Sequence, residues 1–150
     1  MIKLADFFHT ELISFLSADS RDGALHTLVE ILDKGGKIRD KEIFSQAIIE
    51  REKIVSTGIG MGVAIPHAKL PGYEDFFIAI GILQKGVDWN SLDGAPVRLI
   101  FMIGGPDDKQ TEYLRLLCSL TFALKNEDLR KKILTLNSSE AIMQLLRETF

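Results

Sequence analysis

Two stretches of the sequence are almost continuously apolar over the length of a single β-strand, Phe76 to Leu83 (FFIAIGIL) and Val97 to Ile103 (VRLIFMI). Neither alternates polar with apolar residues, as a strand with one solvent-facing side would. Such strands are expected to be covered on both faces, which requires helices on each side of their sheet. The rest of the chain must therefore supply two helical layers.

Helical periodicity is found before these two strands. Ser20 is a suitable N-cap for a first helix, which the pair Gly35-Gly36 would end. Asp40 is a suitable N-cap for a second helix, which runs to about Lys53. These two helices are candidates for one of the layers.

Three more helices are expected after the second strand. Asp107 and Asp108 are placed to open a long helix that ends near Lys125. Two shorter helices are expected over residues 127–134 and 138–147. The apolar positions of the long helix predict a buried stripe of Leu114, Leu117, Leu120 or Thr121, and Leu124.

Two shorter apolar segments complete the expected sheet. Leu12 to Leu16 is predicted as an edge strand, and Val63 to Ile65 as a short strand that Pro66 holds extended. We therefore expect an α/β fold, a three-layer sandwich whose mixed central sheet of about five strands is flanked by helices. Residues 1–150 are expected to form one domain.

Composition excludes several classes of function. The net charge of −3 and the lack of a basic block make nucleic acid an unexpected partner. No apolar run approaches the roughly 18 residues of a membrane helix, so membrane insertion is not expected. Cys118 is the single cysteine, which rules out an internal disulfide and a multi-cysteine metal site. A cytoplasmic location is expected on the same ground.

The stretch GIGMGVAIPHAK, residues 58–69, is the main candidate for a binding or catalytic site. Its glycines superficially resemble a dinucleotide-binding loop, but the third is misplaced and no helix can start after it, since Pro66 follows a strand. A metal site is also disfavoured, because His9 and His26 lie on separate elements and no ligand stands near His67 in the sequence. We expect no metal and no cofactor.

His67 is a candidate nucleophile toward phosphorus. A neutral imidazole has a free lone pair near pH 7 and needs no separate base. The glycine-rich loop, with Gly58 and Gly60, could turn backbone N–H groups toward a phosphoryl group.

Three side chains could assist His67. Ser56 and Thr57 would add hydroxyl donors, and Arg51 would add a cation. The residues alone leave an alternative open. In it His67 is a histidine in a turn, Arg51 is a solvated helix residue, and the glycines form an ordinary loop.

The order Arg51-Glu52, then STGIG at 56–60, then GVAIPHA at 62–68, closely resembles one family. The family that these residues resemble is the enzyme IIA domain of the bacterial phosphoenolpyruvate:sugar phosphotransferase system. The resemblance is to its fructose/mannitol class, which includes the nitrogen-related regulatory branch. KGVDW at 85–89 and DGAPV at 93–97 extend the resemblance over essentially the whole chain.

The resemblance implies a cytoplasmic phosphocarrier. By residue match His67 is the phosphorylated residue, Arg51 lies close to it, and Thr57 and the glycines form the loop beneath. The phosphoryl group would come from the phosphocarrier protein HPr, or its nitrogen-branch relative, and pass to a IIB component for sugar uptake. The alternative is a regulatory protein whose phosphorylation controls the binding of a partner. Neither the sugar nor the oligomeric state follows from the resemblance.

One departure from the family pattern concerns Tyr113. Members often carry a second histidine at the start of the later long helix, where this chain has Tyr113. A tyrosine can donate one O–H bond to a phosphoryl oxygen, but it cannot become a cation there. The alternative for Tyr113 is plain packing within the helix stripe.

Overall fold

The computed structural model describes residues 3–150, and a six-stranded mixed sheet lies at its centre. The strand order is β1-β5-β6-β3-β2, with β4 also paired to β6. The longest pair, β5 and β6, is antiparallel, whereas β1 runs parallel to β5, and β3 and β4 run parallel to β6. The strands are β1 (Ile13–Leu16), β2 (Gly58–Gly60), β3 (Val63–Ala64), β4 (His67–Leu70), β5 (Phe77–Val87) and β6 (Val97–Pro106).

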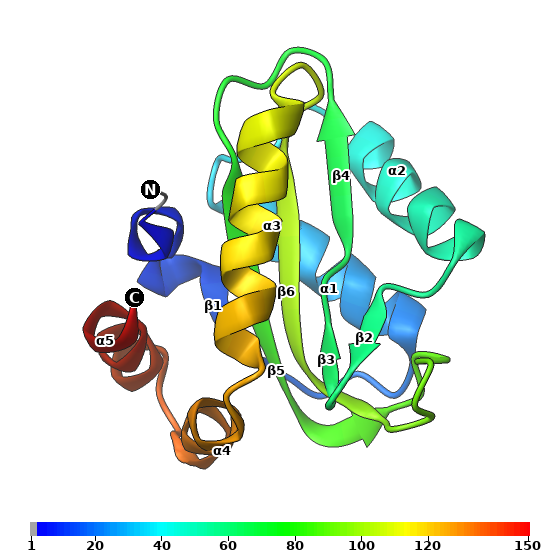
Figure 1. Cartoon of the computed structure of the whole chain (residues 1–150). Helices are drawn as coiled ribbons and strands as arrows, with labels where there is room; N and C mark the ends of the chain where they lie inside the picture. Colours follow the sequence, from blue (N-terminus) through cyan, green and yellow to red (C-terminus); the bar gives the residue numbers. More distant parts are fainter. Residues whose placement is uncertain (1–2) are drawn as a thin grey trace.

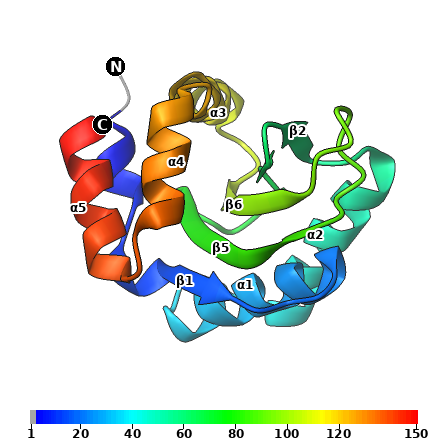
Figure 2. The same cartoon turned by 90° about the horizontal axis from the view of Figure 1, so that it is seen from below.

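Helices cover both faces of this sheet. Figure 2 shows α1 and α2 on one face, and α3 and α4 on the other, with α5 beside α4. The α-helices are α1 (Arg21–Lys34), α2 (Lys41–Ile54), α3 (Gln110–Leu124), α4 (Glu127–Thr135) and α5 (Ser139–Thr149). Two short 3-10 helices, η1 (Leu4–Phe7) and η2 (Thr10–Leu12), precede β1. The predicted three-layer α/β sandwich is confirmed (Figure 1).

The two apolar strands are buried on both faces, as predicted. Along β5, Ile78 and Ile80 belong to the core under α3, while Phe77 and Ala79 belong to the core under α1 and α2. β6 alternates in the same way between these two cores. A continuous apolar run is therefore the sum of two alternating faces, each with its own helical cover.

The predicted N-caps of the early helices are confirmed. The Ser20 side chain accepts a hydrogen bond from Gly23 N–H, and the Asp40 side chain accepts one from Ile43 N–H. These bonds satisfy donors that the first turn of a helix leaves free. The edge position predicted for β1 is also confirmed.

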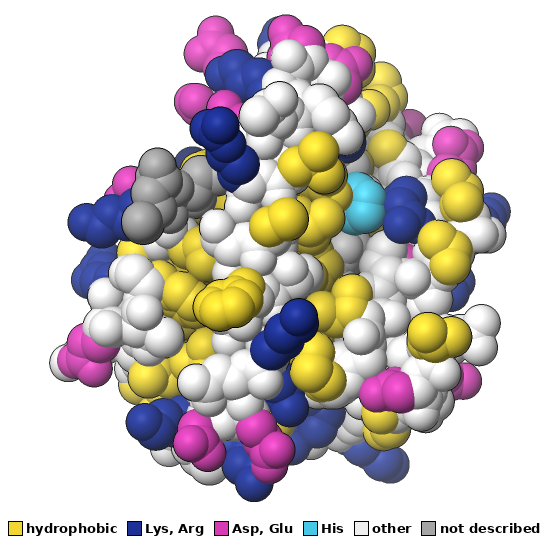
Figure 3. Space-filling view, in the orientation of Figure 1, with side chains coloured by type: hydrophobic (Ala, Val, Ile, Leu, Met, Phe, Trp, Pro, Cys, Tyr) yellow, Lys and Arg dark blue, Asp and Glu magenta, His cyan; other side chains and the backbone are white. Residues whose placement is uncertain are grey.

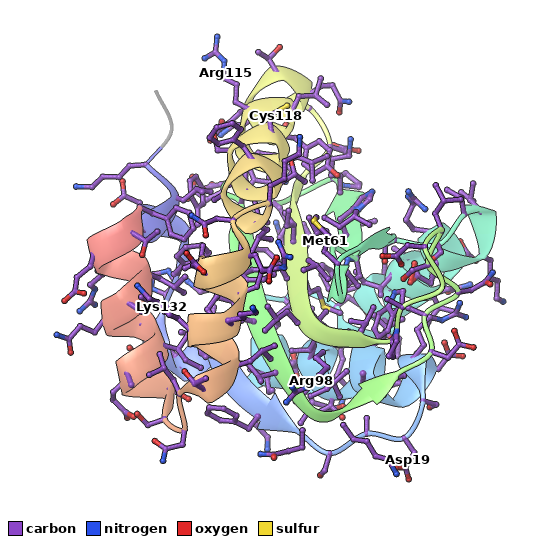
Figure 4. All side chains as sticks on the ribbon, turned by 60° about the horizontal axis from the view of Figure 1, so that its bottom comes forward. Asp19, Met61, Arg98, Arg115, Cys118 and Lys132 are labelled. Atoms are coloured by element: carbon purple, nitrogen blue, oxygen red, sulfur yellow. The ribbon has the colours of Figure 1, made fainter. Side chains whose placement is uncertain are left out.

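The prediction for α3 was wrong in two respects. The helix begins at Gln110, after Asp107 and Asp108, and no side chain caps it. Its buried stripe is Tyr113, Leu116, Leu120 and Leu124, whereas Leu114 is 47% exposed. Apolar residues occur on both sides of α3, so periodicity alone did not fix the buried face. Arg115 and Cys118 project outward from this helix (Figure 4).

Among residues 3–150, no helix has the length and apolar character that crossing a membrane would require.

Candidate functional site

His67 is placed by a break in the strand pairing along β6. β3 and β4 both pair with β6, and the segment between them contains Ile65 and Pro66. Pro66 has no N–H to give, and Ile65 N–H bonds to Thr57 O rather than to β6. The Ile65 carbonyl then accepts a bond from the His67 ring, at 3.1 Å from Nδ1. His67 is the first residue of β4, so it is not a histidine in a turn.

The hydrogen bonds of the His67 ring fix its tautomer. A carbonyl oxygen can only accept, so the proton lies on Nδ1 and is donated to Ile65 O. The lone pair then lies on Nε2, which accepts a bond of 3.2 Å from Arg51 Nε. Nε2 is therefore the nitrogen available as a nucleophile.

Arg51 reaches His67 from the last turn of α2. Its Nη1 donates to the carbonyl of Val55 at 2.8 Å, which uses an acceptor that the helix end leaves free. This anchor orients the guanidinium so that Nε–H points at the His67 ring. The predicted proximity of Arg51 to His67 is thus found in the structure.

The surroundings of His67 favour its neutral form. Burial lowers the pKa of His67 below its usual value, and the nearby charges of Arg51 and Lys69 lower it further. The bond to Ile65 O acts in the opposite direction but is outweighed. A neutral imidazole is the form that can attack phosphorus.

Tyr113 forms one wall of the site. Its ring centroid lies 5.6 Å from that of His67 and 6.0 Å from that of Phe76, and the side chain is buried. Burial raises the pKa of Tyr113, so the phenol stays neutral near pH 7. Its hydroxyl makes no hydrogen bond within residues 3–150. The position is close to His67, as the family match implied.

Lys69 lies in the site but was not predicted. It stands two residues after His67 on β4, and residues at this spacing share one face of a strand. Its Nζ lies 4.2 Å from the centroid of the Tyr113 ring. The signal for Lys69 was strand periodicity, which went unused because β4 was not expected.

Ser56 and Thr57 belong to a second, buried cluster. Thr57 donates from its backbone N–H and its hydroxyl to the two oxygens of Glu52, at 2.9 and 2.8 Å. Trp89 Nε1 donates to the Thr57 hydroxyl at 3.2 Å, and Ser56 Oγ donates to Trp89 O at 2.6 Å. We call Glu52, Ser56, Thr57 and Trp89 the Glu52 cluster. Both hydroxyl protons are used within it, contrary to the expectation that Ser56 and Thr57 offer free donors.

The glycines of the loop also serve packing. Gly58 and Gly60 form β2, and Gly58 N–H donates to Ser56 Oγ at 3.1 Å rather than standing free. A Cβ at Gly58 would lie 2.1 Å from Ser91 Oγ, which leaves no room for a side chain. Gly60 has a φ of 90°, a conformation that favours glycine. The expectation that Gly58 turns a free N–H toward a phosphoryl group is not met.

The two cations of the His67 site, Arg51 and Lys69, form no ion pair with a carboxylate within residues 3–150. Within residues 3–150, the ion pairs are Arg21–Asp22, Lys41–Glu30 and Lys131–Glu127, none of which involves Arg51 or Lys69. In the same part of the chain, no group of three or more His, Cys, Asp and Glu residues is arranged to hold a metal ion. Figure 3 shows a histidine at the surface beside α3, with a basic side chain next to it. Such an arrangement is suited to an anion.

Comparison with protein families gives a match over nearly the whole chain. The family model described as "Phosphoenolpyruvate-dependent sugar phosphotransferase system, EIIA 2" matches residues 6–149. A fructose-specific EIIABC component of Bacillus subtilis is 37% identical over 133 residues, which are 89% of this chain but only 21% of that protein. A fructose-specific EIIA component of Haloferax volcanii is 32% identical over 86% of this chain and 84% of its own.

Solved structures with this fold include a nitrogen regulatory protein and a mannitol IIA enzyme. The nitrogen regulatory protein IIA-Ntr of Neisseria meningitidis matches with a TM-score of 0.88 and 25% identity, over 95% of this chain and 98% of that one. The mannitol IIA of Escherichia coli, solved with phosphorylated IIB, matches with a TM-score of 0.77 over 94% of this chain and 97% of its own. At 22% identity the second match shows the fold alone.

Proposed function

The chain belongs to the EIIA 2 family of the phosphoenolpyruvate-dependent sugar phosphotransferase system, and we propose that His67 is the residue that carries its phosphoryl group. The observation that carries this proposal is the pair of hydrogen-bond partners on the His67 ring, from which its tautomer follows. Nδ1 is held by Ile65 O, so that Nε2 presents its lone pair beside a guanidinium. Burial keeps the ring neutral, with its pKa lowered.

The proposed step is an in-line transfer between two nitrogens. Nε2 of His67 attacks the phosphorus of a donor phosphohistidine, and an Nε2–P bond forms as the donor's N–P bond breaks. The donor nitrogen keeps the electron pair of the broken bond, and the donor ring takes up one proton from solvent. Nδ1 of His67 keeps its own proton on Ile65 O.

Arg51 has a defined part in this step. Its Nε–H rests on the lone pair that must attack, so Arg51 has to leave Nε2 as phosphorus arrives. The guanidinium then bonds to the phosphoryl oxygens, where it offsets negative charge in the transition state. Its anchor on Val55 O keeps this movement short.

Tyr113 and the loop have smaller proposed parts. The hydroxyl of Tyr113 has no bond within residues 3–150 and is free to donate to one phosphoryl oxygen. Ser56, Thr57, Gly58 and Gly60 act indirectly, by fixing the loop that joins α2 to β3.

The proposed donor is a phosphorylated HPr-type protein, and the proposed acceptor is a IIB component. The mannitol relative, solved in complex with phosphorylated IIB, supports the acceptor. We propose that these reactions take place in the cytoplasm and that this domain is located there.

A regulatory role is the second candidate. It is favoured by the similarity to a nitrogen regulatory protein over 95% of this chain. Phosphorylation of His67 would then add a charge of about −2 to the surface and decide whether a partner docks. The chemistry at His67 is the same in both roles.

The experiment is a phosphorylation assay with phosphoenolpyruvate, enzyme I and HPr. The wild type should gain one acid-labile phosphate, and His67→Ala should gain none. His26→Ala is the matched control, because His26 is exposed on α1 and should leave labelling unchanged. Label that persists in His67→Ala would refute the assignment.

A panel of IIB acceptors then separates the two roles. Rapid loss of the label to one purified IIB supports the transport role. A stable label with every IIB supports regulation.

A further inference from the structure

Lys69 projects from the same face of β4 as His67 and is held in place by α3. Its Nζ lies 4.2 Å from the centroid of the Tyr113 ring and bonds to Gln110 Oε1. The Tyr113 ring in turn lies 5.6 Å from the His67 ring, between centroids. One aromatic side chain thus contacts both the ammonium and the imidazole.

The partners of Lys69 are neutral. They are an amide oxygen and the face of an aromatic ring, and no carboxylate within residues 3–150 forms an ion pair with Lys69. Arg51 is in the same state, because its partners are Val55 O and the neutral His67 ring. Within residues 3–150, Arg51 and Lys69 are therefore two cations of the His67 site that form no ion pair with a carboxylate.

A phosphoryl group on His67 would supply that anion. It carries a charge of about −2 and three acceptor oxygens, whereas Arg51 alone supplies a charge of +1. The charge of Lys69 lowers the pKa of His67 as the smallest of its causes, after burial and the charge of Arg51. Lys69 has a flexible stem, so it can leave the Tyr113 ring for a phosphoryl oxygen at the cost of a weak cation–π contact.

We propose that Lys69 is the second phosphoryl-binding cation of this site and that Tyr113 holds it ready. This inference rests on the proposed function of His67. It explains how the site works with a tyrosine at position 113, which provides a π face but no positive charge. An ammonium also keeps its charge across neutral pH, whereas an imidazole loses it near pH 6.5.

The test uses a small phosphoryl donor, so that docking of a protein partner plays no part. Phosphoramidate gives its phosphoryl group to Nε2 of His67 as its own P–N bond breaks, and ammonia leaves with the electron pair. The initial rate of labelling is measured for the wild type, Lys69→Met, Lys69→Gln and Lys69→Arg. The matched control is Lys109→Met, because Lys109 is an exposed lysine that also bonds to a neutral acceptor, Glu74 O.

Removal of the charge should slow labelling by about 10- to 100-fold in both Lys69→Met and Lys69→Gln. Lys69→Arg should restore the rate to within a few-fold, and Lys109→Met should match the wild type. A role in packing alone would not be rescued by arginine. Thermal unfolding of each variant checks that its folded fraction equals that of the wild type, and Lys69→Gln replaces Lys69→Met if the latter does not fold.

Two negative outcomes are distinct. If the wild type takes no phosphate on His67 from either phosphoramidate or HPr, the proposed function fails, and this inference fails with it. If His67 is labelled at the same rate in the wild type, Lys69→Met and Lys69→Gln, only the role of Lys69 is overturned.

Discussion

Arg51 and Glu52 are consecutive residues of α2, but their side chains enter two regions that are built in opposite ways. Arg51 enters the half-exposed His67 site, where its acceptors are a helix-end carbonyl and an imidazole. Glu52 is 3% exposed and accepts two bonds from Thr57 within the Glu52 cluster. One turn of helix thus serves both a reactive site and a structural one, since successive side chains point about 100° apart.

The difference lies in how complete the bonding is. The Glu52–Thr57–Trp89 bonds form a continuous chain, in which the Thr57 hydroxyl both donates and accepts. The His67 site has two cations with neutral partners, and the lone pair of His67 Nε2 accepts a hydrogen bond from Arg51. A complete network fixes one conformation, whereas an incomplete one can rearrange around an incoming anion.

The largest expected effect is on the His67 side of this comparison. Arg51→Met should lower the rate of phosphorylation by HPr by about 100- to 1,000-fold, because it removes a donor to the transition state. The free energy of unfolding should change by less than ~1 kcal/mol, since the lost bonds are partly exposed. Both quantities are measured on the same preparation, with Lys53→Met as the control for loss of an exposed α2 cation. A wild-type rate would contradict the role given to Arg51.

The next largest effect should be on the stability of the Glu52 cluster. Glu52→Ala leaves two donors of Thr57 without acceptors and should reduce the free energy of unfolding by about 2–4 kcal/mol. Urea denaturation followed by circular dichroism measures it. Glu50→Ala is the matched control, because Glu50 is exposed and bonds only to Gln46 within residues 3–150. If Glu52→Ala lowers the free energy of unfolding no more than Glu50→Ala does, the Glu52 cluster does not have the structural role given to it here.

The smallest effect is on the pH dependence of stability. The pKa of His67 in the folded chain lies below the value of about 6.5 expected in the unfolded chain. As the pH falls below about 6.5, the unfolded chain therefore takes up a proton that the folded chain does not. The contribution of His67 to the free energy of unfolding should therefore fall until the pH passes the folded pKa of His67, and then level off.

An NMR titration of the His67 Cε1 signal checks the sign of the shift directly. The pH dependence should become weaker in His67→Gln. In Arg51→Met the His67 pKa should rise but stay below its usual value, because burial is the larger cause. A midpoint above about 6.5 in the wild type would contradict the desolvated site.

The sequence predicted the layers well because each rests on a strong local signal. The apolar run from Phe76 to Leu83 predicted a strand with two buried faces, and the structure has β5 over Phe77–Val87. Ser20 and Asp40 are capping residues in the expected places. The face of α3 was not predictable, because Leu114 and Leu117 are as apolar as the residues that are buried. Tertiary packing of Tyr113 against Phe76 and His67 decided it.

The site was predicted in part for similar reasons. The proximity of Arg51 and Tyr113 to His67 followed from the family match. The Glu52 cluster did not, because a glutamate near a helix end is by default solvated, and its burial depends on Thr57, which lies outside the helix. Lys69 was not predicted because no strand was expected directly after Pro66, where β4 begins at His67.

Trp89 gives this molecule an optical property that is useful beyond its packing. It is the single tryptophan of the chain and is fully buried, with its indole N–H on the Thr57 hydroxyl. All tryptophan emission therefore comes from the Glu52 cluster, whose Glu52 follows Arg51 directly in α2. An unchanged spectrum on phosphorylation means that the rearrangement stops at Arg51 and Lys69, while a red shift means that it opens the loop itself.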